Sequence, residues 1–195
     1  MTTARRSDPL PFGLALLLLG AGVVAFTLLS LSADDVSYAR TEWTALLSML
    51  LATPAVLLYV LDRGTPGPWW RAFWTVGLIA YLLHFWWAVF RSFNGDLGAV
   101  VERQGWVAYT NFAVTGLWTL DVLIAWVLPG RADTLARIVL RSVTWAAVTA
   151  SFLAAAALFR TGTIAQIGDA LALALVIAFL VRVLGLARLL AGEPK

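Results

Sequence analysis

The sequence contains no cysteine and only one histidine, His84. Without thiols the chain cannot form disulfides, thiolate metal sites or iron–sulfur clusters. A single imidazole does not supply the ligands that a zinc or copper site within the chain would need. A b-type haem between helices generally takes two strong axial ligands, and Met49 is the only soft side chain that could accompany His84. We therefore expect no metal site, and haem is disfavoured unless another chain supplies a ligand.

Charged residues are also scarce, at 13% of the chain, whereas 61% of the residues are hydrophobic. Soluble domains carry about 25% charged residues, and so few charges cannot cover a water-exposed surface of this size. We conclude that lipid surrounds most of the chain. The net charge of +3 then reflects the arginines that set topology, and no nucleic-acid partner is expected.

Long apolar stretches fill the sequence, and a helix needs roughly 20 such residues to cross a hydrocarbon core of about 30 Å. Six stretches meet this requirement. The predicted spans are residues 10–31, 43–61, 69–90, 106–128, 138–159 and 167–190. We predict an all-α, polytopic integral membrane protein in which residues 1–195 form a single transmembrane domain.

Basic residues predict the sidedness of these spans. If the N-terminus is cytoplasmic, nine basic residues lie inside, four lie outside, and Arg182 falls within a span. The inside set is Arg5, Arg6, Arg63, Arg71, Arg131, Arg137, Arg141, Arg188 and Lys195, and the outside set is Arg40, Arg91, Arg103 and Arg160. The positive-inside rule therefore places both termini in the cytoplasm. The expected location is a bacterial inner membrane.

The longest loop, residues 91–105, contains an "NGD" turn signal followed by apolar residues at helical spacing. Leu97, Val100 and Val101 would share one face of a short helix, with Glu102 and Arg103 after them. We predict an amphipathic helix that lies on the outer surface.

Two charged residues are predicted deep inside the spans, where each needs a partner. At about 1.5 Å of rise per residue, Asp121 lies roughly 22 Å and Arg182 roughly 21 Å from the outer edge. Because their depths match, we expect Asp121 and Arg182 to form a structural ion pair between the fourth and sixth spans. A cytoplasmic-side substrate or proton site is the alternative interpretation of these residues.

His84 lies nearer the outer side, roughly 10 Å deep. Tyr81, His84, Trp87 and Arg91 recur at helical spacing and predict one shared face. Asn111 on the fourth span is expected at a similar depth. Imidazole, phenol and amide groups can bind carbonyl oxygens, and indoles can stack on a ring, so these five residues predict a binding site for a quinone or lipid. The structural alternative is a core histidine bonded to Asn111 or to a backbone carbonyl.

Three classes of function fit this sequence. The favoured one is a small integral subunit of a larger inner-membrane complex, respiratory or redox in character, which contacts membrane lipids and other membrane or periplasmic subunits. The sequence requires no cofactor, but a bound quinone or lipid would suit the outer pocket. The second class is a membrane enzyme acting on a lipid or isoprenoid, with Glu42, His84, Asp96 or Asp121 as acid and base. The third is a small-molecule transporter, for which Pro54 would break a helix. Whether the chain is an enzyme is left open.

Overall fold

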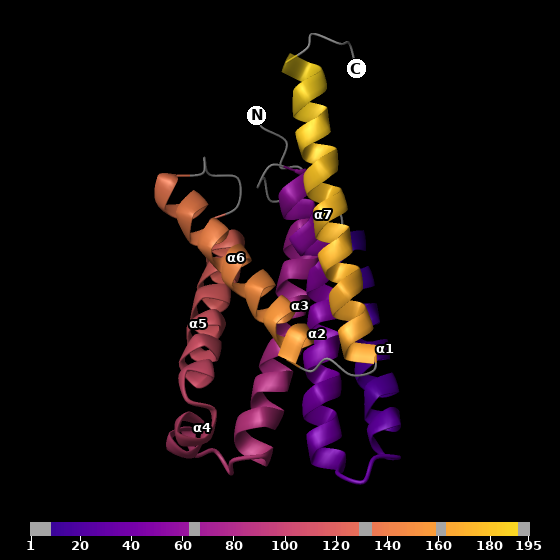
Figure 1. Cartoon of the computed structure of the whole chain (residues 1–195), viewed down its shortest axis with the longest axis vertical. Helices are drawn as coiled ribbons and strands as arrows, with labels where there is room; N and C mark the ends of the chain where they lie inside the picture. The colour runs from indigo at the N-terminus through magenta and orange to yellow at the C-terminus, as the bar shows by residue number, and fades with distance from the viewer. Residues whose placement is uncertain (1–8, 63–66, 129–133, 159–162, 191–195) are drawn as a thin grey trace.

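The computed structural model describes residues 9–62, 67–128, 134–158 and 163–190, and every regular element among them is helical (Figure 1). The elements are α1 (Leu10–Ser30), α2 (Val36–Leu61), α3 (Pro68–Trp86), the π-helical turn η1 (Trp87–Arg91), α4 (Leu97–Gln104), α5 (Trp106–Val127), α6 (Leu135–Leu158) and α7 (Thr163–Leu190). Six of these helices, with η1 continuing α3, are long and apolar enough to cross a membrane, as predicted. The sidedness that the arginines predict is not tested by the fold.

The helices α1, α2 and α3 pack together, and the α2–α3 interface is the most extensive among the described helices. A small residue makes this close approach possible. A Cβ atom added to Gly77 of α3 would lie 2.9 Å from the Cβ atom and 3.0 Å from the Cα atom of Ala52 on α2. Beside this contact, the buried hydroxyl of Ser48 donates a hydrogen bond to the carbonyl of Gly77 at 3.1 Å. The two backbones are therefore in direct contact.

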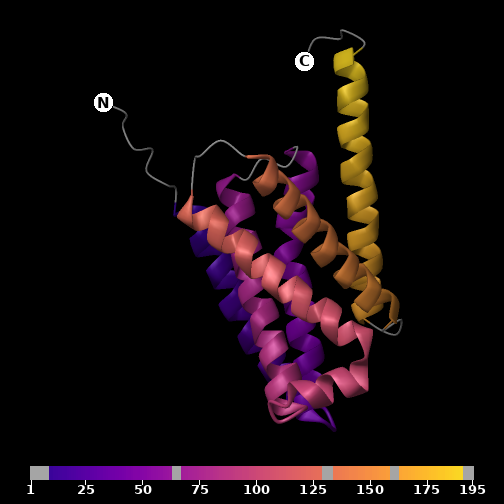
Figure 2. The same ribbon diagram turned by 90° about the vertical axis from the view of Figure 1, so that its left-hand side faces the viewer.

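The remaining spans complete the bundle around α3 and α2. The α5 helix packs against α3 and α6, and α7 packs against α2 and α6. Figure 2 shows that α7 rises beyond the other helices at the end of the bundle where α1 begins. The opposite end holds residues 31–35, η1 and α4, and we call it the distal end.

α1 differs from the other spans because it is apolar on all sides. Only Pro11, Ala15 and Ser30 of α1 are buried, whereas large side chains such as Leu17 and Leu28 are exposed. A helix that is hydrophobic all round but covered on one side only is suited to a lipid environment. α1 therefore forms one edge of the bundle.

Local signals explain where the elements at the distal end begin. The Asp35 side chain accepts a hydrogen bond from the Tyr38 backbone N–H at 2.9 Å, and this cap starts α2 seven residues before the predicted span. Asp96 caps α4 in the same way, through the Ala99 N–H at 3.0 Å. The predicted short helix is thus confirmed, and the turn before it contains Asn94 at φ 52° and Gly95 at φ 79°.

The sequence pattern did not predict η1. In this turn the Ser92 N–H donates to the Trp87 carbonyl, five residues earlier, at 3.3 Å. Such π-helical turns are rare and occur often at functional sites. η1 joins the end of α3 to the surface loop and contains two of the predicted site residues, Trp87 and Arg91.

Candidate functional site

His84 makes a structural contact between two helices. Its Nδ1 atom lies 2.9 Å from the Thr41 carbonyl oxygen on α2. Because a carbonyl can only accept, Nδ1 carries the proton and donates it. In the neutral ring Nε2 is then the acceptor. The structure thus contains the core-histidine arrangement, through a backbone carbonyl and not through Asn111.

Tyr81 lies next to His84, with ring centroids 6.0 Å apart, but its hydroxyl reaches Asn111 on α5. The Tyr81 hydroxyl donates to the Asn111 backbone carbonyl at 3.4 Å, and this same carbonyl accepts a hydrogen bond from the Thr115 hydroxyl at 2.7 Å. The Tyr81 ring is buried and packs against Trp118 with centroids 5.5 Å apart. Tyr81 and Asn111 therefore join α3 to α5, while His84 joins α3 to α2.

Trp87 and Arg91 form a separate group with Arg40, a residue expected in a loop. The guanidinium carbon of Arg40 lies 5.1 Å from the centroid of the Trp87 ring, and that of Arg91 lies 5.8 Å from it. Both distances are within the range of cation–π attraction. The five residues predicted to make one site thus lie near one another along α3 and η1 and on α5, but they bond to different neighbours: Tyr81 to α5, and His84 to α2.

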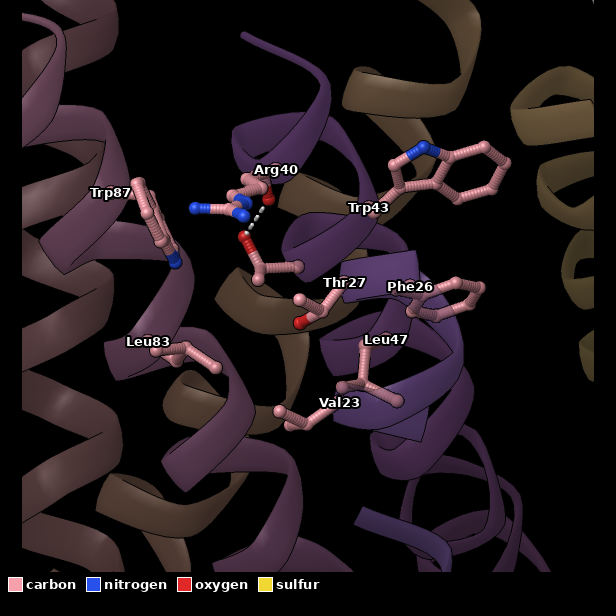
Figure 3. A pocket seen from close by; sticks show the side chains of 9 residues that line it. Val23, Phe26, Thr27, Arg40, Trp43, Leu47, Leu83 and Trp87 are labelled. Carbon is pink, nitrogen blue, oxygen red and sulfur yellow. Dashed lines mark hydrogen bonds between the residues drawn. The ribbon is translucent and has the colours of Figure 1, made fainter. Parts of the chain in front are cut away.

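A hollow of about 200 Å³ lies beside this arginine–tryptophan group, between α1, α2 and α3 (Figure 3). Figure 3 shows the Arg40 side chain directed toward Trp87, with Phe26 and Trp43 on the opposite side. The lining residues are Val23, Phe26, Thr27, Arg40, Trp43, Thr44, Leu47, Leu83 and Trp87. One end of the hollow is thus cationic and aromatic, and the rest is largely apolar.

The walls of the hollow are held by contacts of their own. Phe26 of α1 stacks on Trp43 of α2 with centroids 5.1 Å apart and planes 20° from parallel. The Arg40 Nε–H donates to the Ser30 hydroxyl at 3.2 Å, and this hydroxyl donates in turn to the Thr27 carbonyl at 2.7 Å. These bonds hold the Arg40 side chain against the end of α1.

Neither arginine of this group is neutralised within the described part of the chain. No carboxylate among those residues forms an ion pair with Arg40 or Arg91. Two positive charges therefore lie against one indole ring at the distal end of the bundle, beside an apolar hollow. This arrangement can receive the negatively charged end of an amphiphilic molecule.

The ion pair in the centre of the bundle differs from the predicted one. Asp121 of α5 is fully buried, and its Oδ1 atom lies 3.8 Å from the Arg141 Nε atom on α6. Its Oδ2 atom accepts a hydrogen bond from the Trp74 indole N–H on α3 at 2.9 Å. Arg141 is buried too, and its guanidinium lies over the Trp70 ring at 5.4 Å. Asp121 thus joins α3, α5 and α6.

Arg182, the expected partner of Asp121, lies elsewhere. It is exposed on α7, and its Nη1 atom donates to the Val60 carbonyl near the end of α2 at 3.3 Å. The depths estimated for Arg182 and Asp121 match, but α7 packs mainly against α2 and α6, whereas α5 packs mainly against α6, α3 and α4. The pairing of Asp121 with Arg182 is therefore corrected to a pairing with Arg141, a residue expected at the cytoplasmic edge.

Arg40 was not predicted as a site residue. The reason is the boundary of the second span, which was placed at Trp43, so that Arg40 fell in a loop. A usable signal was present: Asp35 precedes the helix as a cap, and Arg40, Trp43, Thr44 and Leu47 follow at i, i+3, i+4 and i+7 spacing. All four of the latter residues line the hollow.

The described residues contain no group of three or more histidine, cysteine, aspartate or glutamate side chains placed to bind a metal ion. Comparison of the chain with protein-family models, with curated proteins and with solved structures found no match. The function is therefore argued from the geometry of the distal hollow.

Proposed function

We propose that this protein is a small integral subunit of an inner-membrane complex and that its own task is to hold an amphiphilic molecule, a lipid or a quinone, in the distal hollow. The observation that carries the proposal is the hollow itself, which combines apolar walls with a guanidinium and an indole at one end. Ligand sites of this kind are mostly apolar, with a few polar groups that fix the orientation of the ligand.

The proposed site is displaced from the one that the sequence favoured. Trp87 lines the hollow and Arg91 lies against the Trp87 ring. His84 contributes indirectly, because its hydrogen bond to the Thr41 carbonyl joins α3 to α2 beside Arg40. Tyr81 and Asn111 contribute indirectly, since they hold α3 against α5.

The distribution of the arginines predicts on which side of the membrane the hollow lies. With both termini in the cytoplasm, the distal end faces the outer side of the membrane. The hollow then lies in the outer leaflet, and α4 lies along the outer surface with Leu97 half exposed. A partner subunit on the periplasmic side would meet α4, and membrane-embedded partners would meet the spans.

The lipid-enzyme alternative requires an acid and a base to meet. Three of the four candidate groups are engaged with different neighbours: His84 bonds the Thr41 carbonyl, Asp96 caps α4, and Asp121 accepts from Trp74. These three lie on α3, at the start of α4 and on α5, and the fourth, Glu42, lies on α2. This distribution over separate contacts favours a binding role over catalysis by those groups.

Purification from native membranes in a mild detergent, followed by native mass spectrometry, tests the proposal. We expect the wild-type chain to retain an amphiphile and to co-purify with other subunits. Leu83→Trp places a larger side chain in the hollow and should abolish retention of the amphiphile. The matched control is Leu82→Trp, because Leu82 is the exposed neighbour of Leu83 and does not line the hollow.

Comparison of Leu83→Trp with Leu82→Trp decides whether the hollow is the binding site. Both must show the same helical circular dichroism as the wild type. Equal retention by Leu83→Trp and by Leu82→Trp would overturn the proposed binding site. Purification of the chain alone, in several mild detergents, would overturn its assignment as a subunit.

A further inference from the structure

We propose that the occupant of the distal hollow is an anionic phospholipid, with its phosphate held by Arg40 and Arg91 and the start of one acyl chain in the apolar part of the hollow. This inference rests on the proposed amphiphile-binding function and adds the chemical class of the ligand.

Charge is the first argument for an anion. Arg40 and Arg91 both lie against the Trp87 ring, and neither forms an ion pair within the described part of the chain. Two cations held within 5.1 Å and 5.8 Å of the centre of the same ring repel each other, and an anion bound by both reduces this repulsion. A quinone carbonyl is neutral and would leave both charges uncompensated. A phosphate can accept hydrogen bonds from both guanidinium groups.

The geometry of Arg40 is suited to this task. Its Nε–H donates to Ser30, which leaves the two Nη groups at the end of the side chain to bind a ligand, and Figure 3 shows this side chain directed toward Trp87. Guanidinium groups stack on aromatic rings and bind phosphate oxygens through two parallel N–H groups. Arg91 is exposed at the end of η1 and can approach the same phosphate from the aqueous side.

The apolar lining provides the second half of the recognition. Val23, Leu47 and Leu83 lie on three different helices around the hollow. Leu47 is seven residues beyond Arg40 on α2, which corresponds to about 10 Å along the helix axis. The hollow therefore runs from a charged end toward the membrane interior, as the upper part of an acyl chain does below its headgroup.

The size of the hollow favours partial insertion of a lipid over enclosure of a ring. Pockets that bury a drug-sized ligand usually measure about 300–1,000 Å³, whereas this hollow measures about 200 Å³. It can hold one end of a molecule while the rest stays in the bilayer. A membrane lipid that stands in the leaflet beside α1 and α3 satisfies this condition.

Native mass spectrometry of the full chain, reconstituted with phosphatidylglycerol and phosphatidylcholine in equal amounts and with a ubiquinone as a third ligand, tests the inference. We expect wild-type protein to retain phosphatidylglycerol at least about tenfold over phosphatidylcholine, since a charged hydrogen bond lost at a partly buried site costs roughly this factor. Arg40→Gln and Arg91→Gln should each reduce this preference several-fold. Arg103→Gln is the matched control, because Arg103 is exposed on α4 against Phe93 and does not line the hollow.

The outcomes separate this inference from the function on which it rests. If Leu83→Trp abolishes retention while Arg40→Gln and Arg91→Gln keep the wild-type lipid preference, the anionic headgroup is wrong and amphiphile binding stands. Preferential retention of the ubiquinone would likewise contradict an anionic headgroup and leave amphiphile binding intact. If Leu83→Trp changes nothing, both proposals fall.

Soluble glycerol phosphate distinguishes a lipid from a free phosphate ester. We expect millimolar glycerol phosphate not to displace the bound lipid, because it lacks the acyl chain that fills the apolar lining. Displacement would show that the arginines bind a soluble anion and would overturn the lipid assignment. Arg91 is exposed, so Arg91→Gln is expected to fold and keeps the test decisive even if Arg40→Gln does not.

Discussion

Removal of either member of the buried ion pair should destabilise the bundle strongly, whereas removal of both should cost less than the sum. Asp121 and Arg141 are buried, and the Oδ1 and Nε atoms are 3.8 Å apart. At an effective dielectric constant of about 20, unit charges at this distance attract each other by about 4 kcal/mol. A single substitution that leaves the other charge buried typically costs about 3–5 kcal/mol.

The informative variants are Asp121→Asn, Arg141→Met and the double variant. Methionine keeps the apolar contact with Trp70 but removes the charge, and asparagine can still accept a bond from Trp74. We expect each single variant to lose about 3–5 kcal/mol of unfolding free energy. In the double variant no buried charge is left unpaired, so we expect a coupling energy of at least about 2 kcal/mol.

The measurement is reversible unfolding in mixed detergent micelles with increasing dodecyl sulfate, followed by circular dichroism. The same cycle with Arg182→Met in place of Arg141→Met is the control, because Arg182 is exposed and bonds the Val60 carbonyl. Coupling between Asp121 and Arg182 should be below about 0.5 kcal/mol. Additive effects for Asp121 and Arg141, or strong coupling of Asp121 to Arg182, would refute this network of buried contacts.

Three further predictions concern packing, the histidine and the sidedness. Gly77→Val should destabilise by about 1–3 kcal/mol in the same unfolding assay, since its added atoms meet the α2 backbone, whereas Gly116→Ala, in open space, should be neutral or stabilising. His84→Leu should cost about 1 kcal/mol, the net value of one hydrogen bond, and a loss above about 4 kcal/mol would show that the imidazole does more than join α3 to α2. Because the chain has no cysteine, the single-cysteine variants Leu97→Cys and Leu61→Cys can be labelled with an impermeant maleimide in intact cells. We expect only Leu97→Cys to react. Reaction of Leu61→Cys alone would show that the topology is the reverse of the proposed one.

Helix positions were largely predictable from the sequence, and the two errors have separate causes. Apolar length identified all six long helices, and turn and cap residues identified α4. The start of α2 was placed too late because the first two turns of α2 are polar, although Asp35 caps them. η1 was missed because a π-helical turn depends on how α3 meets the loop that follows, and no residue pattern marks it.

The sites were predictable only in part. Helical spacing placed Trp87 near Arg91 and Tyr81 near His84, and the estimated depth placed Asn111 near Tyr81. Spacing could not tell that Tyr81 faces α5 while His84 and Trp87 face α2, because a face of a helix is wide enough to contact two neighbours. The same limit produced the error at Asp121, since depth along the membrane normal does not say which helices are adjacent.

The sequence by itself determined which segments form helices long and apolar enough to cross a membrane, because that property depends on the composition and length of a segment alone. It also determined that buried charges need partners. Only the tertiary structure decided which partners meet: Asp121 with Arg141 and Trp74, and Arg40 with Trp87. The physical reason is that lipid is as apolar as the helix surfaces, so close contacts such as Gly77 against Ala52, and not hydrophobicity, select which helices become neighbours.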